Sequence, residues 1–256
     1  MKVIFLDIDG VLQPLGRQTR FKYMNEIPEL CKKLNTSLNN GFDYVAYIEE
    51  RESHAYDVAA VYYDWDKPSV EYLRHILNTT GAKIVLSSDW REEGIERMRG
   101  MLGIHHLDTY LVDATYFVSH YERHWAKDTK LGEEKWDTWV SVIRSLHKKM
   151  HEIYPTEGTG WFAKSVDVRA AEIREYLDRH SEITSFVSLD DRNLEKGLLG
   201  RFIQTKNYIT EDDMNNCIQL LNKSDGPFPL DEPLKSEELQ VWREKYVYSY
   251  FPKTIE

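Results

Sequence analysis

Short apolar runs recur along the chain, and they predict buried β-strands. Each run is too short for a helix and ends in polar residues, which is typical of strands inside a parallel sheet. The runs cover residues 3–6, 83–86 and 186–189 and, with a less regular pattern, residues 201–204. A sheet of at least these four strands is therefore expected.

Helical patterns stand between or beside these runs. A first helix is expected between Ser69, as its N-cap, and Gly81, as its stop signal. Residues 170–179 repeat the helical spacing, and a last helix is expected from Thr210 to Leu221, with an acidic first turn that complements its dipole. Strands alternating with helices predict an α/β fold of three layers, a parallel sheet covered by helices on both faces.

Two long stretches, residues 16–66 and 114–161, depart from this alternation. Both are rich in aromatic and charged residues, and loops of this length usually have a function or a structure of their own. We interpret them as insertions that form a cap or lid over the carboxyl edge of the sheet, with an amphipathic helix over residues 133–153. The core then spans residues 1–222, and residues 223–256 form a C-terminal extension.

The composition fits a folded chain without a general attraction for polyanions. Hydrophobic residues make up 41% of the 256 residues, so a sizeable core is possible. The formal net charge is −10, so a nucleic acid would need a local basic patch. Cys31 and Cys217 are far apart in the sequence, and we expect reduced, buried side chains rather than a disulfide or a zinc site.

The apolar runs also bear on location. The N-terminal run ends at Asp7 and is too short for a signal peptide. No stretch approaches the ~20 apolar residues that a membrane span needs. We therefore expect a cytoplasmic protein without membrane attachment.

The first candidate for chemistry is a pair of carboxylates directly after the first expected strand. Asp7 would stand at the strand tip and Asp9 two residues later, in a turn that Gly10 allows the backbone to make. The carboxyl ends of parallel strands face the binding crevice of such a sheet. Two carboxylates so close repel each other unless a proton or a cation intervenes, and Mg²⁺ accepts such ligands. The alternative is a plain Asp-Gly turn.

Two further runs deliver polar groups to the same edge. The run at residues 186–189 ends in Asp190 and Asp191, and two acidic tips on neighbouring strands can form one cation site. A plain acidic turn explains this poorly, because the same feature would have to arise twice. The run at residues 83–86 leads into Ser87 and Ser88, whose hydroxyls can bind a phosphate oxygen together with backbone N–H groups.

In this order, the motifs resemble those of the haloacid dehalogenase (HAD) superfamily. The likeness extends from residue 1 to about residue 221, and it implies a Rossmann-like HAD fold. The motif set is specific to the superfamily but not to a substrate. Asp7 and Asp9 match the first motif of the superfamily. Either Ser87 or Ser88 matches the second motif, and Asp190 and Asp191 match the fourth.

The resemblance implies a Mg²⁺-dependent phosphomonoester hydrolase that works through an aspartyl-phosphate. Asp7 would attack phosphorus, and Asp9 would protonate the leaving oxygen and then deprotonate the attacking water. Asp7, the main-chain carbonyl of Asp9 and Asp190 would hold Mg²⁺, and Asp191 would support the ion directly or through water. An Asp at position 9 favours phosphatase over dehalogenase chemistry.

Two assignments within the resemblance stay open. The Ser-x-Trp-Arg spacing favours Ser88 over Ser87 as the hydroxyl of the second motif. The third motif requires a Lys or Arg ahead of the fourth-motif strand, where it would balance the carboxylates and bind phosphate. Lys164 fits this place best and Arg169 is the alternative, although a charged residue here could simply belong to a solvated helix face.

A narrower resemblance links the chain to the HAD domains of RNA-repair proteins of the Swiss-army-knife type. It rests on residues 83–91, 172–177 and 189–191 and continues through residues 202–205 and 209–213. It implies removal of a 3′ or 5′ phosphate from a nucleic-acid end, with a phosphorylated small molecule as the other substrate class. This sequence contains no Gly-x-x-x-x-Gly-Lys-Ser/Thr loop of the kind that a linked kinase would carry.

A competing class is a catalytically silent HAD fold that serves as a binding module, against which the intact Asp7, Asp9 and Asp190 argue. Two groups in the first insertion bear on a nucleic-acid substrate. A local basic patch is available from Arg17, Arg20, Lys22, Lys32 and Lys33. Aromatic residues that either stack on a base or form the core of a small cap are Tyr56, Tyr62, Tyr63 and Trp65.

Overall fold

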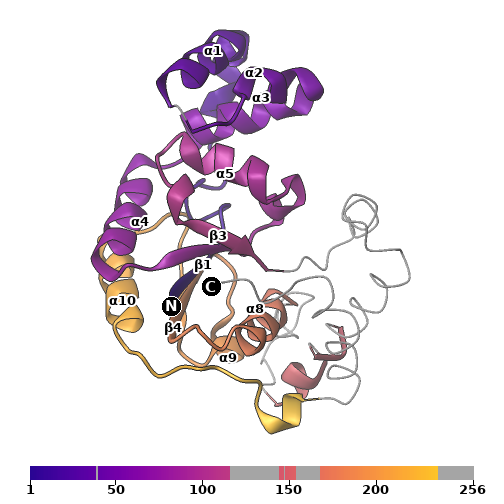
Figure 1. Ribbon diagram of the computed structural model, residues 1–256, viewed down its shortest axis with the longest axis vertical. Coiled ribbons are helices and arrows are strands. Elements are labelled where there is room, and N and C mark those ends of the chain that lie inside the picture. The colour runs from indigo at the N-terminus through magenta and orange to yellow at the C-terminus, as the bar shows by residue number, and fades with distance from the viewer. Residues whose placement is uncertain (39, 116–143, 147, 154–167, 236–256) are drawn as a thin grey trace. The chain divides into compact units, whose positions relative to one another are not determined.

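A computed structural model describes residues 1–38, 40–115, 144–146, 148–153 and 168–235 (Figure 1). The chain divides into two compact units. Of the described residues, the first unit contains the whole β-sheet and most of the helices, and the second includes the helices at residues 168–179 and 195–198. The first unit comprises Met1–Ala114, Thr184–Asn193 and Arg201–Asp225, and the second comprises Thr115–Ile183, Leu194–Gly200 and Gly226–Glu256.

Five parallel strands form one sheet in the order β3-β2-β1-β4-β5. The chain moves outward from β1 to β3 on one side and then returns to the other side of β1 for β4 and β5. The order therefore reverses at β1, which is where ligands bind in open α/β sheets. The strands are β1 (Lys2–Leu6), β2 (Lys83–Leu86), β3 (Leu111–Ala114), β4 (Ser185–Asp190) and β5 (Phe202–Gln204).

The four strands expected from the apolar runs are confirmed, and β3 is an addition to them. Its sequence Leu111-Val112-Asp113-Ala114 contains a charge and alternates only weakly, so no apolar run marks it. It lies at one edge of the sheet and pairs with β2 alone. Edge position explains the missing signal, because an edge strand is buried less completely than a central one.

Side chains on both faces of the sheet are buried. Ile4 and Leu6 belong to a hydrophobic cluster that includes Leu73 and Leu77 of the helix α4 (Lys67–Thr80). Neighbouring residues of a strand point to opposite faces, and Phe5, which alternates with Ile4 and Leu6, has an exposed fraction of 0% as well. Both faces are therefore covered, and the predicted three-layer α/β fold is confirmed.

Helices of both units are short to medium in length. In the first unit α4 and α10 lie side by side, and α10 also contacts β4 (Figure 1). The second unit contains α8 and α9. The helices are α1 (Ile27–Ser37), α2 (Tyr44–Glu50), α3 (Glu52–Ala59), α4 (Lys67–Thr80), α5 (Ile95–Gly103), α8 (Val168–Arg179), α9 (Glu195–Leu198) and α10 (Glu211–Leu221).

The prediction of Ser69 as the N-cap of α4 is wrong. The helix begins three residues earlier, and its N-cap is Asp66, whose carboxylate accepts a hydrogen bond from the Ser69 backbone N–H at 3.1 Å. Pro68 stands in the first turn, where its missing N–H costs nothing, and this allows the earlier start. The end at Gly81, with φ +69°, is confirmed, as is Thr210 as the N-cap of α10.

The first long stretch, residues 16–66, folds into α1, α2 and α3 and several short turns of helix. The side chain of Tyr44 is fully buried, and its hydroxyl donates to the Gly100 carbonyl of α5 at 2.7 Å. The stretch ends in a turn of π-helix, Ala60–Asp64, just before α4. It therefore has its own structure, as its length suggested, and it is attached to α5.

Parts of the later sequence lie outside the described residues. Residues 144–146 and 148–153 are helical, which agrees with the second half of the helix expected over residues 133–153. The remainder of that helix and residues 236–256 are not described. Among the described residues, no helix is both long and apolar enough to cross a membrane.

The two cysteines are free and buried, as expected. Burial raises the pKa of the Cys31 thiol to about 11 and also raises the pKa of Cys217. Both thiols are therefore uncharged near neutral pH and act as small apolar side chains.

Candidate active site at the carboxyl edge of the sheet

Three neighbouring strands bring polar residues to one line at their carboxyl ends. Asp7 directly follows β1, and its backbone N–H donates to the Leu189 carbonyl of β4 at 3.0 Å. On the other side, the Ser87 backbone N–H donates to the Leu6 carbonyl at 2.8 Å. The parallel register pairs Leu6 with a leucine of each neighbour, so Ser87, Asp7 and Asp190 stand side by side at the sheet edge.

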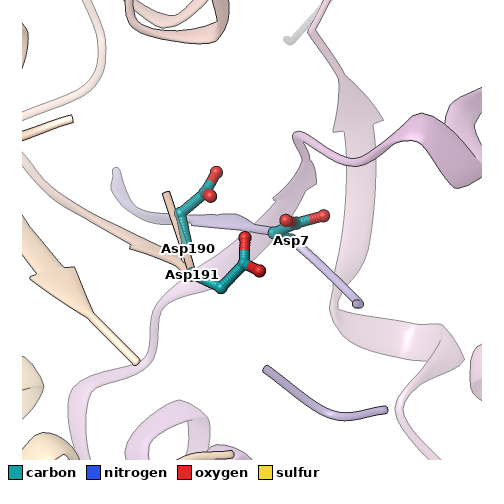
Figure 2. A group of neighbouring side chains, drawn as sticks. All are labelled: Asp7, Asp190 and Asp191. Carbon is teal, nitrogen blue, oxygen red and sulfur yellow. The ribbon is translucent and has the colours of Figure 1, made fainter. Parts of the chain in front are cut away.

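Three of the predicted carboxylates form a cluster. Asp7, Asp190 and Asp191 each offer an oxygen within 4.8 Å of the others (Figure 2). Asp7 is 4% exposed and Asp190 is 0% exposed, whereas Asp191 is partly exposed. Of the side chains that the structure describes, these are the only three His, Cys, Asp or Glu residues gathered in this way. The sequence prediction that two acidic strand tips come together is therefore borne out in geometry.

The chain turns tightly after Asp7. The Ile8 carbonyl accepts the backbone N–H groups of Leu12 and Gln13, both at 2.9 Å. The Ile8 N–H in turn donates to the Asp7 Oδ1 atom at 2.8 Å, which orients the carboxylate. Local backbone hydrogen bonds thus set the direction in which Asp7 points.

Gly10 is required at its position for two reasons. Its φ is +72°, a conformation that L side chains rarely adopt. A Cβ atom placed on it would also lie 2.6 Å from the Asp191 Cβ and 2.7 Å from its Oδ2. The Gly10 carbonyl accepts a 2.7 Å hydrogen bond from the Thr205 hydroxyl, which holds the loop against the segment after β5.

The loop after β4 is also held by several hydrogen bonds. The Arg192 backbone N–H donates to Asp190 Oδ1 at 2.9 Å. The Thr205 N–H donates to the Asp190 carbonyl at 3.0 Å, and the Gln204 side chain donates to the Asp191 carbonyl at 2.9 Å. Gln204 and Thr205 lie more than ten residues away from the carboxylates, so the sequence does not predict these two partners.

The carboxylate of Asp9 has a donor at each oxygen. The indole Nε1 of Trp90 donates to Oδ2 at 3.0 Å, and the Gln13 amide donates to Oδ1 at 3.1 Å. Asp9 is not a member of the three-carboxylate cluster. In the sequence Trp90 stands out only as part of the Ser-x-Trp-Arg spacing, and the structure adds its contact with Asp9.

Burial raises the pKa of Asp9 above its usual value. The hydrogen bond from Trp90 acts in the opposite direction, and the charges of Asp7, Asp89 and Asp191 add to the effect of burial. A carboxyl group with a raised pKa retains its proton to higher pH. This property suits a residue that must give up a proton during a reaction.

The two candidate serines differ in their surroundings. The Ser88 Oγ accepts a long hydrogen bond of 3.5 Å from the Trp90 backbone N–H and caps the short helix Asp89–Glu93. The Ser87 Oγ is buried and has no hydrogen-bond partner among the described residues. An unpartnered buried hydroxyl next to a carboxylate cluster is a candidate ligand-binding group.

The structure describes only one of the two candidates for the third motif. Lys164 lies outside the described residues. Arg169 is in the first turn of α8, and its side chain is 4% exposed, so it is not on a solvated helix face. It belongs to the second unit, whereas the three-carboxylate cluster belongs to the first.

A family model described as "HAD domain in Swiss Army Knife RNA repair proteins" matches residues 3–214. The chain belongs to this HAD family. Both resemblances drawn from the motifs are thereby confirmed, and the matched residues include every strand of the sheet and all three carboxylates. Comparisons of this HAD domain with curated proteins and with solved structures found no match.

Family membership supports a hydrolase of the HAD type. HAD proteins generally use Mg²⁺, and the acidic cluster gives this HAD domain a set of hard oxygen ligands at the expected edge of the sheet.

Replacement of Gly10 tests the packing of the two loops. Gly10→Ala should lower the free energy of unfolding by about 2–4 kcal/mol, because about 1 kcal/mol of backbone strain adds to an overlap with Asp191. Gly16→Ala is the matched control, since Gly16 has φ +79° but no atom within 4 Å of an added Cβ. Urea unfolding of both variants measures the difference, and equal losses would contradict the proposed overlap.

Proposed function

We propose that this HAD domain hydrolyses phosphomonoesters and that Asp7 is the nucleophile. The observation that carries the proposal is the alignment of Ser87, Asp7 and Asp190 at the tips of three adjacent strands. This line presents a nucleophilic carboxylate between a hydroxyl and a second carboxylate. Such a site suits the transfer of an anionic group, such as a phosphoryl group, whose negative charge a bound cation would neutralise.

The reaction proceeds in two steps. An Asp7 oxygen attacks phosphorus, the bond from phosphorus to the leaving oxygen breaks, and Asp9 gives that oxygen its proton. Water then attacks the phosphorus of the aspartyl-phosphate and transfers a proton to Asp9, which releases inorganic phosphate and restores the Asp7 carboxylate. The raised pKa of Asp9 supports the first step, because it keeps the acid protonated nearer to neutral pH.

The carboxylate cluster fits a Mg²⁺ ion. Mg²⁺ prefers carboxylate and carbonyl oxygens as ligands. Asp7, Asp190 and Asp191 each offer a carboxylate oxygen, and these oxygens lie within 4.8 Å of one another. Asp7 and Asp190 would hold the ion with the Asp9 carbonyl, and Asp191 would support it. When bound, the ion would neutralise charge on the phosphoryl group.

Ser87 is the better candidate for the phosphate ligand. Its Oγ has no partner among the described residues, whereas the Ser88 Oγ accepts a hydrogen bond from the Trp90 backbone N–H as a helix cap. A hydroxyl that is buried beside Asp7 can donate to a phosphate oxygen without first giving up another hydrogen bond. The family resemblance also implies a basic residue for phosphate binding, and Lys164 and Arg169 stay the two candidates for that role.

A nucleic-acid end is the second candidate substrate, which the RNA-repair family favours. Within the cap that we propose for residues 16–66, the aromatic residues divide into two groups. Trp65 is buried, with an exposed fraction of 2%, whereas Tyr56 and Tyr62 are 40% and 41% exposed. Phe21 is 52% exposed and its ring lies 5.9 Å from that of Tyr56. These exposed rings are available for stacking on bases.

Charge supports nucleic-acid binding less than the aromatic rings do. Arg17 pairs with Asp66 and Arg20 pairs with Asp64, both at 3.2 Å. These ion pairs neutralise part of the basic patch expected in the first insertion. Binding of a nucleic acid to this surface would therefore depend on stacking and only weakly on salt.

The reaction is tested with p-nitrophenyl phosphate and Mg²⁺. Asp7→Asn should lower turnover by at least about 10³-fold, because the amide is not a nucleophile. Asp212→Asn, an exposed position in the first turn of α10, is the control and should leave turnover unchanged. If neither the native protein nor Asp7→Asn turns over any of several phosphate esters with several cations, the silent binding module is the better interpretation.

The two serines are separated by a pair of matched variants. Ser87→Ala should raise KM or lower kcat so that kcat/KM falls by about 10-fold, the loss expected for one hydrogen bond to a charged group. Ser88→Ala should change kcat/KM by less and should mainly lower stability through the lost cap. The opposite ranking of kcat/KM would return the assignment to Ser88.

The nucleic-acid proposal is tested by comparing two substrates. Tyr62→Ala should raise KM for a short single-stranded oligonucleotide with a terminal phosphate by about 5-fold or more, since one stacked base contributes about 1–3 kcal/mol. KM for p-nitrophenyl phosphate should not change. Tyr208→Ala, which removes an exposed tyrosine outside the insertion, is the control. Both 3′- and 5′-phosphorylated oligonucleotides are measured, and no cleavage of either would favour a small-molecule substrate.

A further inference from the structure

Trp90 occupies an unusual place for a large aromatic residue. It belongs to the short helix Asp89–Glu93 that directly follows Ser88, beside the line of strand tips. Its indole N–H is not directed to solvent or to a backbone carbonyl but to Oδ2 of Asp9, at 3.0 Å. The motif that contains Trp90 was assigned through its serine, and the proposed chemistry makes no use of the indole.

The indole and Gln13 together fix the carboxyl group of Asp9. An Asp side chain has two rotatable bonds. Donors at both oxygens, Trp90 at Oδ2 and Gln13 at Oδ1, restrict both rotations. The indole can only donate a hydrogen bond, so the oxygen that faces it, Oδ2, serves as the acceptor. The Gln13 amide N–H donates to Oδ1, and an oxygen that accepts such a bond can still carry a proton of its own and direct it elsewhere.

The aromatic rings of Trp65 and His105 pack behind the indole and hold it in place. The Trp65 ring meets that of Trp90 edge to face, with centroids 6.4 Å apart. Trp65 stacks on His105, with ring centroids 5.3 Å apart. The Nε2 atom of His105 is hydrogen-bonded to the Val61 carbonyl oxygen at 2.8 Å. The Trp90 side chain therefore has a rigid support behind it, as a group that positions another must have.

The far end of the same short helix is also anchored. Glu93 lies 3.3 Å from Arg97 and 3.5 Å from His54, which is fully buried in α3. Ser88 caps the first end of the helix. With both ends held and the ring supported, the position of the indole N–H is set by the fold and not by Asp9.

We propose that Trp90 is a positioning residue that holds the Asp9 carboxyl in the orientation for proton transfer to the leaving group. The inference rests on the proposed function, in which Asp9 is the general acid. A merely structural Trp90 would support the packing of Trp65 and nothing more. The two roles differ in one respect, because only a positioning role makes the effect of Trp90 depend on how much the leaving group needs a proton.

Single-turnover measurements with enzyme in excess separate these roles. p-Nitrophenolate leaves without much help from an acid, whereas an alkoxide leaves only when it is protonated. In Trp90→Phe, release of the alcohol from an alkyl phosphate should fall by about 10²-fold, while release of p-nitrophenol should stay within about threefold of the native rate. Following leaving-group release in the first turnover keeps the later hydrolysis step out of the comparison.

Trp65→Phe is the matched control. The substitution is the same, the ring is the neighbour of Trp90, and the Trp65 Nε1 atom is buried without a hydrogen-bond partner among the described residues. Because Phe keeps an aromatic ring against Trp90 and removes an N–H that has no such partner, Trp65→Phe should change the release of both leaving groups by the same small factor. A second variant keeps the test sound if Trp90→Phe does not fold. Replacement of Trp90 by benzothienylalanine retains the shape of the ring and exchanges only the indole N–H for sulfur.

The outcomes are distinct. If the native protein releases neither leaving group, the proposed function fails. If it releases both, and the Trp90 variants slow them equally or not at all, the function stands and the positioning role is overturned. Selective loss of alcohol release in Trp90→Phe or in the benzothienylalanine protein supports the role.

Discussion

Mutual repulsion among carboxylates is the constraint on which the active edge of this protein depends. Asp7, Asp190 and Asp191 lie within 4.8 Å of one another, and two of them are almost completely buried. Negative charges so arranged would separate if the backbone allowed it. The backbone does not allow it, because β1 and β4 are hydrogen-bonded neighbours in the middle of the sheet. The strands that form the core of the fold therefore hold together the groups that a cation would bind.

The parts of this arrangement that the sequence predicts are those recorded in short stretches of chain. Apolar runs followed by acidic residues marked Asp7 and Asp190, and the order of the motifs indicated the superfamily. The α4 cap was misplaced for a local reason, since Asp66 and Ser69 are both good N-caps and Pro68 between them decides the start. β3 was missed because an edge strand has no need of a continuous apolar run.

What the sequence does not predict is the pairing of residues from different parts of the chain. Trp90 reaches Asp9 across 81 positions, and Thr205 reaches Gly10 across 195. No spacing rule connects such residues, because the contact arises only after β1, β2 and β5 have taken their places in one sheet. The same holds for the exposed rings of Phe21 and Tyr56, which lie together on the surface although 35 residues separate them in the chain.

The absence of a side chain at Gly10 has a consequence for how this site can change. The space that a Cβ would fill is taken by Asp191, and the carbonyl of Gly10 is held by Thr205. The loop after β1 and the loop after β4 are therefore packed against each other so closely that the shape of each depends on the other. An engineer who transplants one of these loops into another sheet must carry the other with it, and a sequence that alters one must find a matching change in its counterpart.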